Sequence, residues 1–188
     1  MSALSKNATW SLVTCPIGKT IVGCHWVYTE KYLPDGSIEC LKVRLVAKGY
    51  NQTYGADYVE TFSPIAKISS VWILISLASN LGWPLFQLDT KNAVKNAFLN
   101  GDLNEEVYME QPPRFVAQGK FGKVCRLHKA ICGLKQSPGA WFGKFSEVVL
   151  KFRLRRCHSD HFVFSHTSAK GKILLIVYID DIIIIGDN

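Results

Sequence analysis

The sequence contains no Cys-x-x-Cys pair, and so no pair of its five histidines follows one at zinc-finger spacing. A structural zinc site is therefore not expected. The N-terminus also has no apolar signal segment. We expect a protein that is not secreted and that keeps its cysteines as free thiols in a reducing, intracellular compartment. These cysteines are Cys15, Cys24, Cys40, Cys125, Cys132 and Cys157.

No apolar run is long enough to cross a membrane. The run from Ile173 to Ile185 is shorter than a spanning helix and has two acids at its centre. No repeat of solenoid length is present either. With 188 residues, of which 48% are hydrophobic, the chain can form one domain with a sizeable core.

Acidic residues are the minority charge, with 15 Asp and Glu against 22 Lys and Arg. The resulting net charge of +7 favours a polyanionic partner. A basic surface that serves only solubility is the alternative.

Two adjacent carboxylates, Asp180 and Asp181, interrupt the apolar run. Its β-branched residues are typical of a buried strand, in which a carboxylate is costly unless it meets hydrogen-bond donors or a metal ion. The simplest arrangement is a hairpin with Lys172 to Ile179 leading up, the two acids at the tip, and Ile182 to Ile185 returning. Because Asp is common in turns, a purely structural role is an equal alternative for this pair alone.

Alternation, caps and turn residues predict a mixed chain with a largely antiparallel sheet, an α+β or α/β fold. The first helix should follow a cap at Ser69–Ser70 and stop at Gly82, and the last should start at Ser137–Pro138. The expected strands are 10–13, 21–32, 38–47, 83–88, 106–109, 124–127 and 162–164, and the expected helices are 71–78, 91–99 and 139–151.

Lys42 and Arg44 alternate with apolar residues, which places them on one face of a strand. Together with Lys48 they could form a ribbon that binds phosphates, or simply a solvated face. A second basic cluster follows the last helix and comprises Lys151, Arg153, Arg155 and Arg156. We interpret it as a solvated helix end, with a nucleic-acid contact as the alternative.

Asp89 stands at the end of the strand predicted at 83–88, where functional groups often collect. If this strand neighbours the hairpin, Asp89, Asp180 and Asp181 converge and require cations. Two Mg²⁺ ions, or Mn²⁺ in their place, would suit such a cluster and would serve nucleotidyl transfer.

Five segments, in order, resemble motifs of the reverse transcriptase of copia-type retrotransposons. The resemblance extends from about Trp10 to Asp187. The segments are Lys42–Gly49, Glu60–Lys67, Leu88–Asp89 with Asn96–Gly101, Gly133–Pro138, and Tyr178–Asp181.

The resemblance implies a single reverse-transcriptase fragment over 1–188 with the fingers and palm of a right-hand polymerase. About 1–82 would be mainly fingers and about 83–188 mainly palm, with the chain truncated after the catalytic hairpin and the thumb absent. The implied reaction is RNA-directed DNA synthesis on an RNA template and DNA primer from dNTPs. Flanking protease, integrase and ribonuclease H parts would belong to the parent polyprotein, in the cytoplasm, a virus-like particle or the nucleus.

The same resemblance implies roles for individual residues. Asp89, Asp180 and Asp181 would be catalytic and would ligate two metal ions. Nucleotide or triphosphate contacts would come from Lys42, Arg44, Lys48, Val94, Phe98, Gly133 and Gln136, and template or primer contacts from Lys135 and Tyr178.

The chain departs from the family pattern at several positions. Lys91-Asn92-Ala93 recurs as Lys95-Asn96-Ala97, so four residues are extra and Val94 occupies the slot of the aromatic side chain that excludes ribonucleotides. We expect poor discrimination against ribonucleotides. Cys132 replaces a usual Tyr, and Gly139 a usual Arg.

Truncation should also leave Ile182–Ile185 as an exposed apolar edge. We therefore expect weak or no activity from this chain alone. The alternatives are a catalytically dead retroelement remnant and a residual nucleic-acid-binding module.

Overall fold

A computed structural model describes residues 4, 7–61, 64–89, 101–116, 118–178 and 181–187, with the side chain of Asp89 excepted. The chain folds into two compact units. Unit 1 comprises Met1–Thr61 and Phe98–Trp141, and unit 2 comprises Phe62–Ala97 and Phe142–Asn188. Strands and helices occur together, so the fold is α+β. Among the described residues, no helix has the length and apolar character needed to cross a bilayer.

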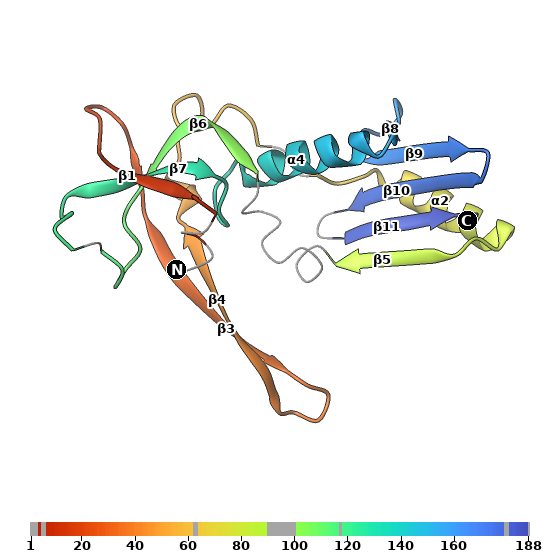
Figure 1. Ribbon diagram of the computed structural model, residues 1–188, viewed down its shortest axis with the longest axis horizontal. Helices are drawn as coiled ribbons and strands as arrows, with labels where there is room; N and C mark the ends of the chain where they lie inside the picture. Colours follow the sequence, from red (N-terminus) through yellow and green to blue (C-terminus); the bar gives the residue numbers. More distant parts are fainter. Residues whose placement is uncertain are drawn as a thin grey trace. The chain divides into compact units, whose positions relative to one another are not determined.

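Unit 1 contains a four-stranded sheet in the order β1-β7-β6-β2 (Figure 1). Only the short β2·β6 pairing is parallel. The core is formed by Val22, Leu45, Met109 and Ile131 among others. The strands are β1 (Trp10–Thr14), β2 (Ile21–Val22), β6 (Asp102–Met109) and β7 (Lys123–Lys129).

Two strands of unit 1, β3 (Cys24–Tyr32) and β4 (Ile38–Ala47), form a long antiparallel hairpin. The turn between them is held by Asp35, whose Oδ1 accepts hydrogen bonds from the Ser37 backbone N–H and hydroxyl. The β4 range confirms the prediction of a strand at 38–47, because alternation is a local signal. A single 3-10 turn, η1 (Gly49–Asn51), follows β4.

Two buried thiols lie in the core of unit 1. Burial, with the nearby Glu110, raises the pKa of Cys24 to about 11 against a smaller opposing effect of Lys48. Burial, with Cys24 beside it, raises the pKa of Cys125 to about 12. Because the thiolate is the reactive form, both act as small apolar core residues. All six cysteines are free thiols.

Unit 2 is built on a five-stranded antiparallel sheet in the order β5-β11-β10-β9-β8 (Figure 1). Helix α2 (Ile68–Leu81) packs Val71, Leu74 and Ile75 against Val163 and Ile176 of the sheet. The strands are β5 (Leu85–Asp89), β8 (Arg155–Arg156), β9 (Val163–Ser168), β10 (Gly171–Tyr178) and β11 (Asp181–Gly186).

Aromatic packing joins helix α4 (Ser137–Lys151) to the sheet within unit 2. The Phe142 ring lies 4.9 Å from Phe162 and 6.2 Å from Phe164, measured between centroids. The boundary between the units falls inside α4, after Trp141. Trp141, Phe142 and Val149 are buried, whereas Val148 and Phe152 are exposed.

The predicted cap of the first helix is wrong. Helix α2 begins at Ile68 with Lys67 at its N-cap, so Ser69 and Ser70 lie in the first turn. The reason is tertiary: the buried Asp160 accepts the Lys67 backbone N–H at 2.8 Å. The predicted start of the last helix at Ser137–Pro138 is confirmed, because α4 begins at Ser137, whose hydroxyl donates to the Ile131 carbonyl at 2.6 Å. The predicted stop at Gly82 is confirmed by its left-handed backbone, φ 65°.

Three further expectations need correction. Lys151 and Arg153 of the basic cluster lie at the end of α4 as expected, but Arg155 and Arg156 pair with Ser165 and Phe164 as strand β8. Strand β6 begins at Asp102 rather than Glu106.

The segment Ile182–Ile185 is not an exposed edge, because β11 lies between β10 and β5. Ile182 and Ile185 are buried there. The helix predicted at 91–99 lies outside the described residues.

Candidate active site

Two of the three predicted acids occupy opposing positions on neighbouring strands of unit 2. Asp181 is the first residue of β11 and pairs with Tyr178 of β10 on one side. On the other side, the register places Asp89, the last residue of β5, opposite Asp181. Asp180, the third acid, lies outside the described residues, as does the side chain of Asp89. The strand end and the hairpin thus meet at one end of the sheet.

The neighbourhood of Tyr178 fixes this end of the sheet. Ile65 forms an isolated bridge with Tyr178, and the Ala66 N–H donates to the Val177 carbonyl at 3.1 Å. Tyr178 is half-buried and packs against the apolar cluster under α2. Asp181 is half-buried. The hairpin of β10 and β11 that carries it is therefore held in place by the segment before α2 as well as by the pairing of its own strands.

Register partners in an antiparallel pair have Cβ atoms about 4.5–5.5 Å apart. Two carboxylates at such neighbouring positions favour a bound cation or a proton, and carboxylate oxygens are the donors that Mg²⁺ prefers. The residue types at this register pair therefore fit a divalent cation. Within the described ranges, no three His, Cys, Asp or Glu side chains gather in a metal-binding group.

The predicted cationic face lies on β4 of unit 1. Lys42 pairs with Thr29 and Arg44 with Val27, so both cations share one face of the hairpin, and both are half-buried. Burial raises the pKa of the nearby Cys132 thiol, while the positive charges of Arg44 and Lys42 oppose that rise. The loop that contains Cys132 thus lies beside the basic residues of β4.

Two glycines allow the segment after β4 to touch the loop 131–136. A Cβ on Gly49 would overlap the carbonyl oxygen of Gly133. A Cβ on Gly133, whose φ is 92°, would overlap the carbonyl oxygen of Ala47. The Ala47 N–H also donates to the Cys132 carbonyl at 2.8 Å. Two of the sequence motifs, far apart in the chain, are therefore in backbone contact.

A buried amide network completes this contact. Gln52 Nε2 donates to Gln136 Oε1 at 3.1 Å, and Gln52 Oε1 accepts the Lys135 N–H at 2.9 Å. Gln136 Nε2 in turn donates to the Asp57 carbonyl at 3.2 Å. The Gln136 side chain therefore fixes the loop, while the Lys135 side chain is exposed. Sequence analysis missed Gln52, since nothing near it in the sequence marks a buried amide.

The remaining predicted residues are placed differently. Lys48 follows β4 and lies against Gly23, beside the carboxylate of Glu110. Its neighbours are therefore not those of Lys42 and Arg44. Val94 and Phe98 lie outside the described residues.

Comparisons with known proteins give a consistent result. The family model described as reverse transcriptase (RNA-dependent DNA polymerase) matches residues 7–188. The chain is 47% identical to the retrovirus-related Pol polyprotein from transposon RE2 and 45% identical to that from transposon RE1, both of Arabidopsis thaliana. It is 42% identical to that from transposon TNT 1-94 of Nicotiana tabacum.

Each of these three alignments covers all of this chain. The chain spans 13–14% of the length of these relatives. No solved structure matches it. The match over nearly every residue shows that the chain belongs to the reverse transcriptase (RNA-dependent DNA polymerase) family, as a fragment of a copia-type retrotransposon Pol polyprotein.

Proposed function

We propose that this chain carries the nucleotidyl-transfer machinery of RNA-directed DNA synthesis, with Asp89, Asp180 and Asp181 as ligands of two Mg²⁺ ions. The observation that supports this most is the register pair of Asp89 and Asp181 at the end of β5 and β11. Bound ions would supply Lewis-acid stabilisation of the charge on the reacting phosphates. The carboxylates would bind these cations at this end of the sheet. Tyr178 on β10 is the register partner of Asp181.

The proposal gives the basic residues of unit 1 a part in substrate binding. Lys42 and Arg44 would contact the triphosphate of an incoming dNTP, since guanidinium and ammonium groups bind phosphate oxygens strongly. Gln136 and Gly133 would shape the pocket through the loop 131–136, and Lys135 would contact the RNA template or DNA primer. The division into fingers over about 1–82 and palm over about 83–188 stays a prediction.

A primer-extension assay with an RNA template, a DNA primer, dNTPs and Mg²⁺ tests the proposal. Asp181→Asn should reduce extension by about 100-fold or more, because it removes a fixed charge from the reacting centre. Glu147→Gln removes an acid from an exposed pair with Lys144 in the same unit and should leave extension unchanged. Because weak or no extension is expected from this chain alone, the wild type is first compared with a protein-free blank. Extension by the wild type that Asp181→Asn equals would contradict the proposal, and no extension by the wild type would favour the second candidate below.

A nucleic-acid-binding module without catalysis is the second candidate. It is favoured by the net charge of +7 and by the four extra residues that follow Asp89. This candidate predicts binding of template-primer with a steep dependence on salt, but no extension by the wild type. Fluorescence anisotropy between low and high salt, run beside the extension assay, separates the two.

A further inference from the structure

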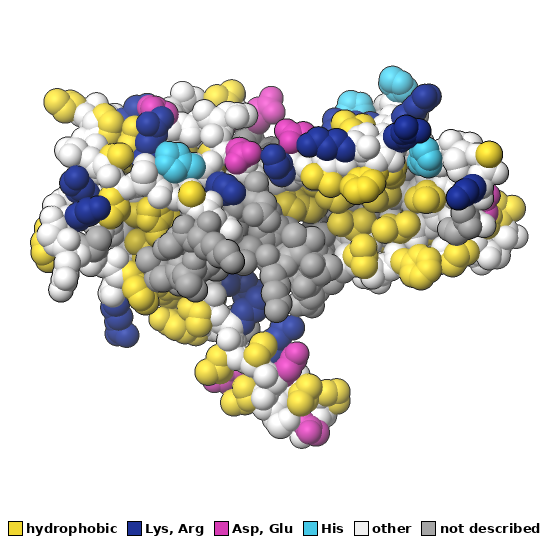
Figure 2. Space-filling view, viewed as in Figure 1, with side chains coloured by type: hydrophobic (Ala, Val, Ile, Leu, Met, Phe, Trp, Pro, Cys, Tyr) yellow, Lys and Arg dark blue, Asp and Glu magenta, His cyan; other side chains and the backbone are white. Residues whose placement is uncertain are grey.

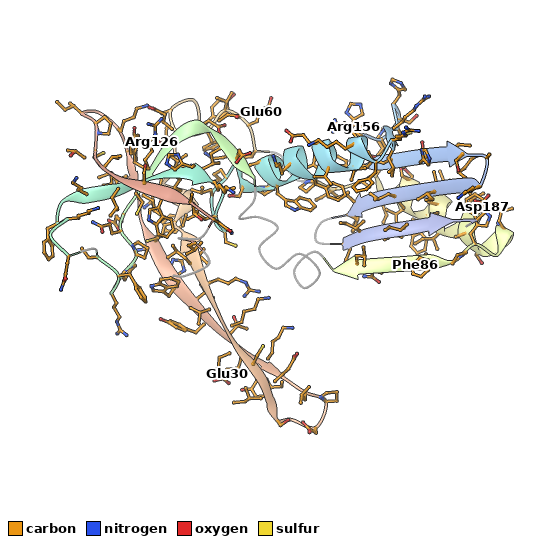
Figure 3. All side chains as sticks on the ribbon, in the orientation of Figure 1. Glu30, Glu60, Phe86, Arg126, Arg156 and Asp187 are labelled. Carbon is orange, nitrogen blue, oxygen red and sulfur yellow. The ribbon has the colours of Figure 1, made fainter. Side chains whose placement is uncertain are left out.

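A basic cavity lies in unit 2 at a distance from the acids. It has a volume of about 710 Å³ and is formed where α4 ends and β8 meets β9. Figure 2 shows Lys, Arg and His side chains gathered over this part of the molecule, and Figure 3 labels Arg156 there. The lining residues are Leu150, Arg153, Leu154, Arg155, Ser165, His166 and Thr167.

The cavity is separate from the register pair of acids. Arg155 pairs with Ser165, which pairs with Leu174, whereas Asp181 pairs with Tyr178 further along β10. Standard strand rise and spacing then put Arg155 about 20 Å from Asp181. A ligand group in this cavity would not touch the acids.

Arg153 occupies a backbone position that favours glycine. Its φ is 64°, in the left-handed region, immediately beyond the last turn of α4. Its N–H donates to the Leu150 carbonyl at 3.0 Å, and its own carbonyl accepts a hydrogen bond from His166 Nδ1 at 3.1 Å. Helices commonly end with glycine in this conformation, and an arginine here makes the fold less stable than a glycine would. Such an outlier at a cavity suggests a function for the side chain.

The two lining arginines are available to a ligand. Neither Arg153 nor Arg155 has an ion pair with any carboxylate that the structure describes. The neighbouring Arg156 differs, because its guanidinium lies 5.4 Å from the Phe142 ring centroid and 5.6 Å from that of Phe164. The cavity therefore offers two guanidinium groups and the hydroxyls of Ser165 and Thr167, and no acid lines it.

We propose that this cavity binds a backbone phosphate of a nucleic-acid strand, with Arg153 and Arg155 as its principal contacts. Guanidinium forks and hydroxyls are the groups that proteins use for phosphate oxygens. This inference rests on the proposed function, since it takes nucleic acid to be the partner. A free phosphate ion shares the chemistry, and the experiment separates the two sources.

The test measures the binding of a fluorescent single-stranded 20-mer to the full chain by anisotropy, over a range of NaCl concentrations. Arg153→Gly and Arg155→Gln should each lower the slope of log K against log salt by about 0.7 to 1, as expected for one lost phosphate contact. The loss of affinity should be the same for oligonucleotides of different sequence. Arg155→Lys should recover part of the affinity.

Lys120→Gln is the matched control, because Lys120 is exposed and lies in unit 1. It also removes one positive charge, but it should leave the slope unchanged. Arg153→Gly should keep or raise the melting temperature, so its weaker binding cannot be attributed to misfolding. An unchanged slope in both arginine variants, or an equal change in Lys120→Gln, would overturn the inference.

Titration with inorganic phosphate, measured by isothermal calorimetry, distinguishes a free phosphate ion from a backbone phosphate as the ligand. Weak phosphate binding that is lost in Arg153→Gly, together with strong oligonucleotide binding, supports the inference. Phosphate binding with no oligonucleotide binding overturns it. Loss of extension in Asp181→Asn tests the proposed function, whereas a lower salt slope in Arg153→Gly and Arg155→Gln tests this cavity, so failure of one and failure of the other give different results.

Discussion

At the scale of single residues, Asp160 is a buried acid that joins separate segments of unit 2. The side chain is 5% exposed. Its Oδ2 accepts the Lys67 N–H at 2.8 Å and its Oδ1 accepts the Phe162 N–H at 3.1 Å. Burial alone would raise the pKa of this carboxyl, but hydrogen bonds from Ser70, Lys67 and Phe162 and the charge of Lys67 outweigh it and lower the pKa.

Asp160→Asn should destabilise the protein by about 1–3 kcal/mol, because buried donors lose a charged acceptor. The wild-type contribution is present above the ordinary Asp pKa of 3.8 and is lost as the pH falls through the lowered folded value. Urea unfolding of both proteins from pH 7 to pH 3 measures this. The stability difference should shrink towards acid pH.

Asp35→Asn is the control for this prediction. Hydrogen bonds from Ser37 lower the pKa of Asp35 as well, but Asp35 is exposed in a turn. Its substitution should leave the melting temperature nearly unchanged. A constant difference between Asp160→Asn and wild type across the pH range would contradict the role given to the Asp160 charge.

Sequence analysis did not identify Asp160 or Gln52, and the reason is physical. Lys67 precedes Asp160 by 93 residues, and Gln52 precedes Gln136 by 84. A buried acid or amide looks like a surface residue until its distant partners are known. Asp89 and Asp181 were identified because each stands directly beside an apolar run in the sequence.

At the scale of elements, the contact between β4 and the loop 131–136 depends on the absence of side-chain atoms. Gly133→Ala should lower the free energy of unfolding by more than about 2 kcal/mol. The added Cβ overlaps with Ala47, and this overlap adds to the strain of a positive φ. Gly18→Ala separates the two effects. Gly18 has φ 80° and no atom near its Cβ position. Gly18→Ala should therefore lower the free energy of unfolding by about 1 kcal/mol, from the backbone strain alone. Thermal unfolding of both variants gives the comparison, and equal losses would refute the steric account.

The predicted elements succeed or fail according to the range of the interactions that set them. Strand β4 and the Gly82 stop of α2 follow from alternation and from a glycine, both of which are local signals. The start of α2 depends on Asp160, and β8 depends on pairing with β9. No local pattern carries that information, so these boundaries could not be predicted.

At the scale of the whole molecule, the chain crosses three times from one unit to the other, and each unit has its own hydrophobic core. Because each unit has its own buried cluster, a local defect should be felt mainly in its own unit. In hydrogen-exchange mass spectrometry, Asp160→Asn should accelerate exchange in β9 and β10 but not in β6 and β7. Gly133→Ala should do the opposite. Equal acceleration in both units for either variant would show that the molecule opens as one body.

The sheet of unit 2 places the strand that carries Asp89 at its margin. In the described sheet β5 pairs with β11 alone, and Phe86 and Leu88 are 60% and 42% exposed. A strand bonded on a single side opens at a lower free-energy cost than the central strands of its sheet. Local opening of β5 would separate Asp89 from Asp181 while most of the sheet, and so most of the circular dichroism signal, stayed intact. That spectrum is therefore a poor measure of the integrity of the acid pair, and an opened apolar edge strand would favour aggregation.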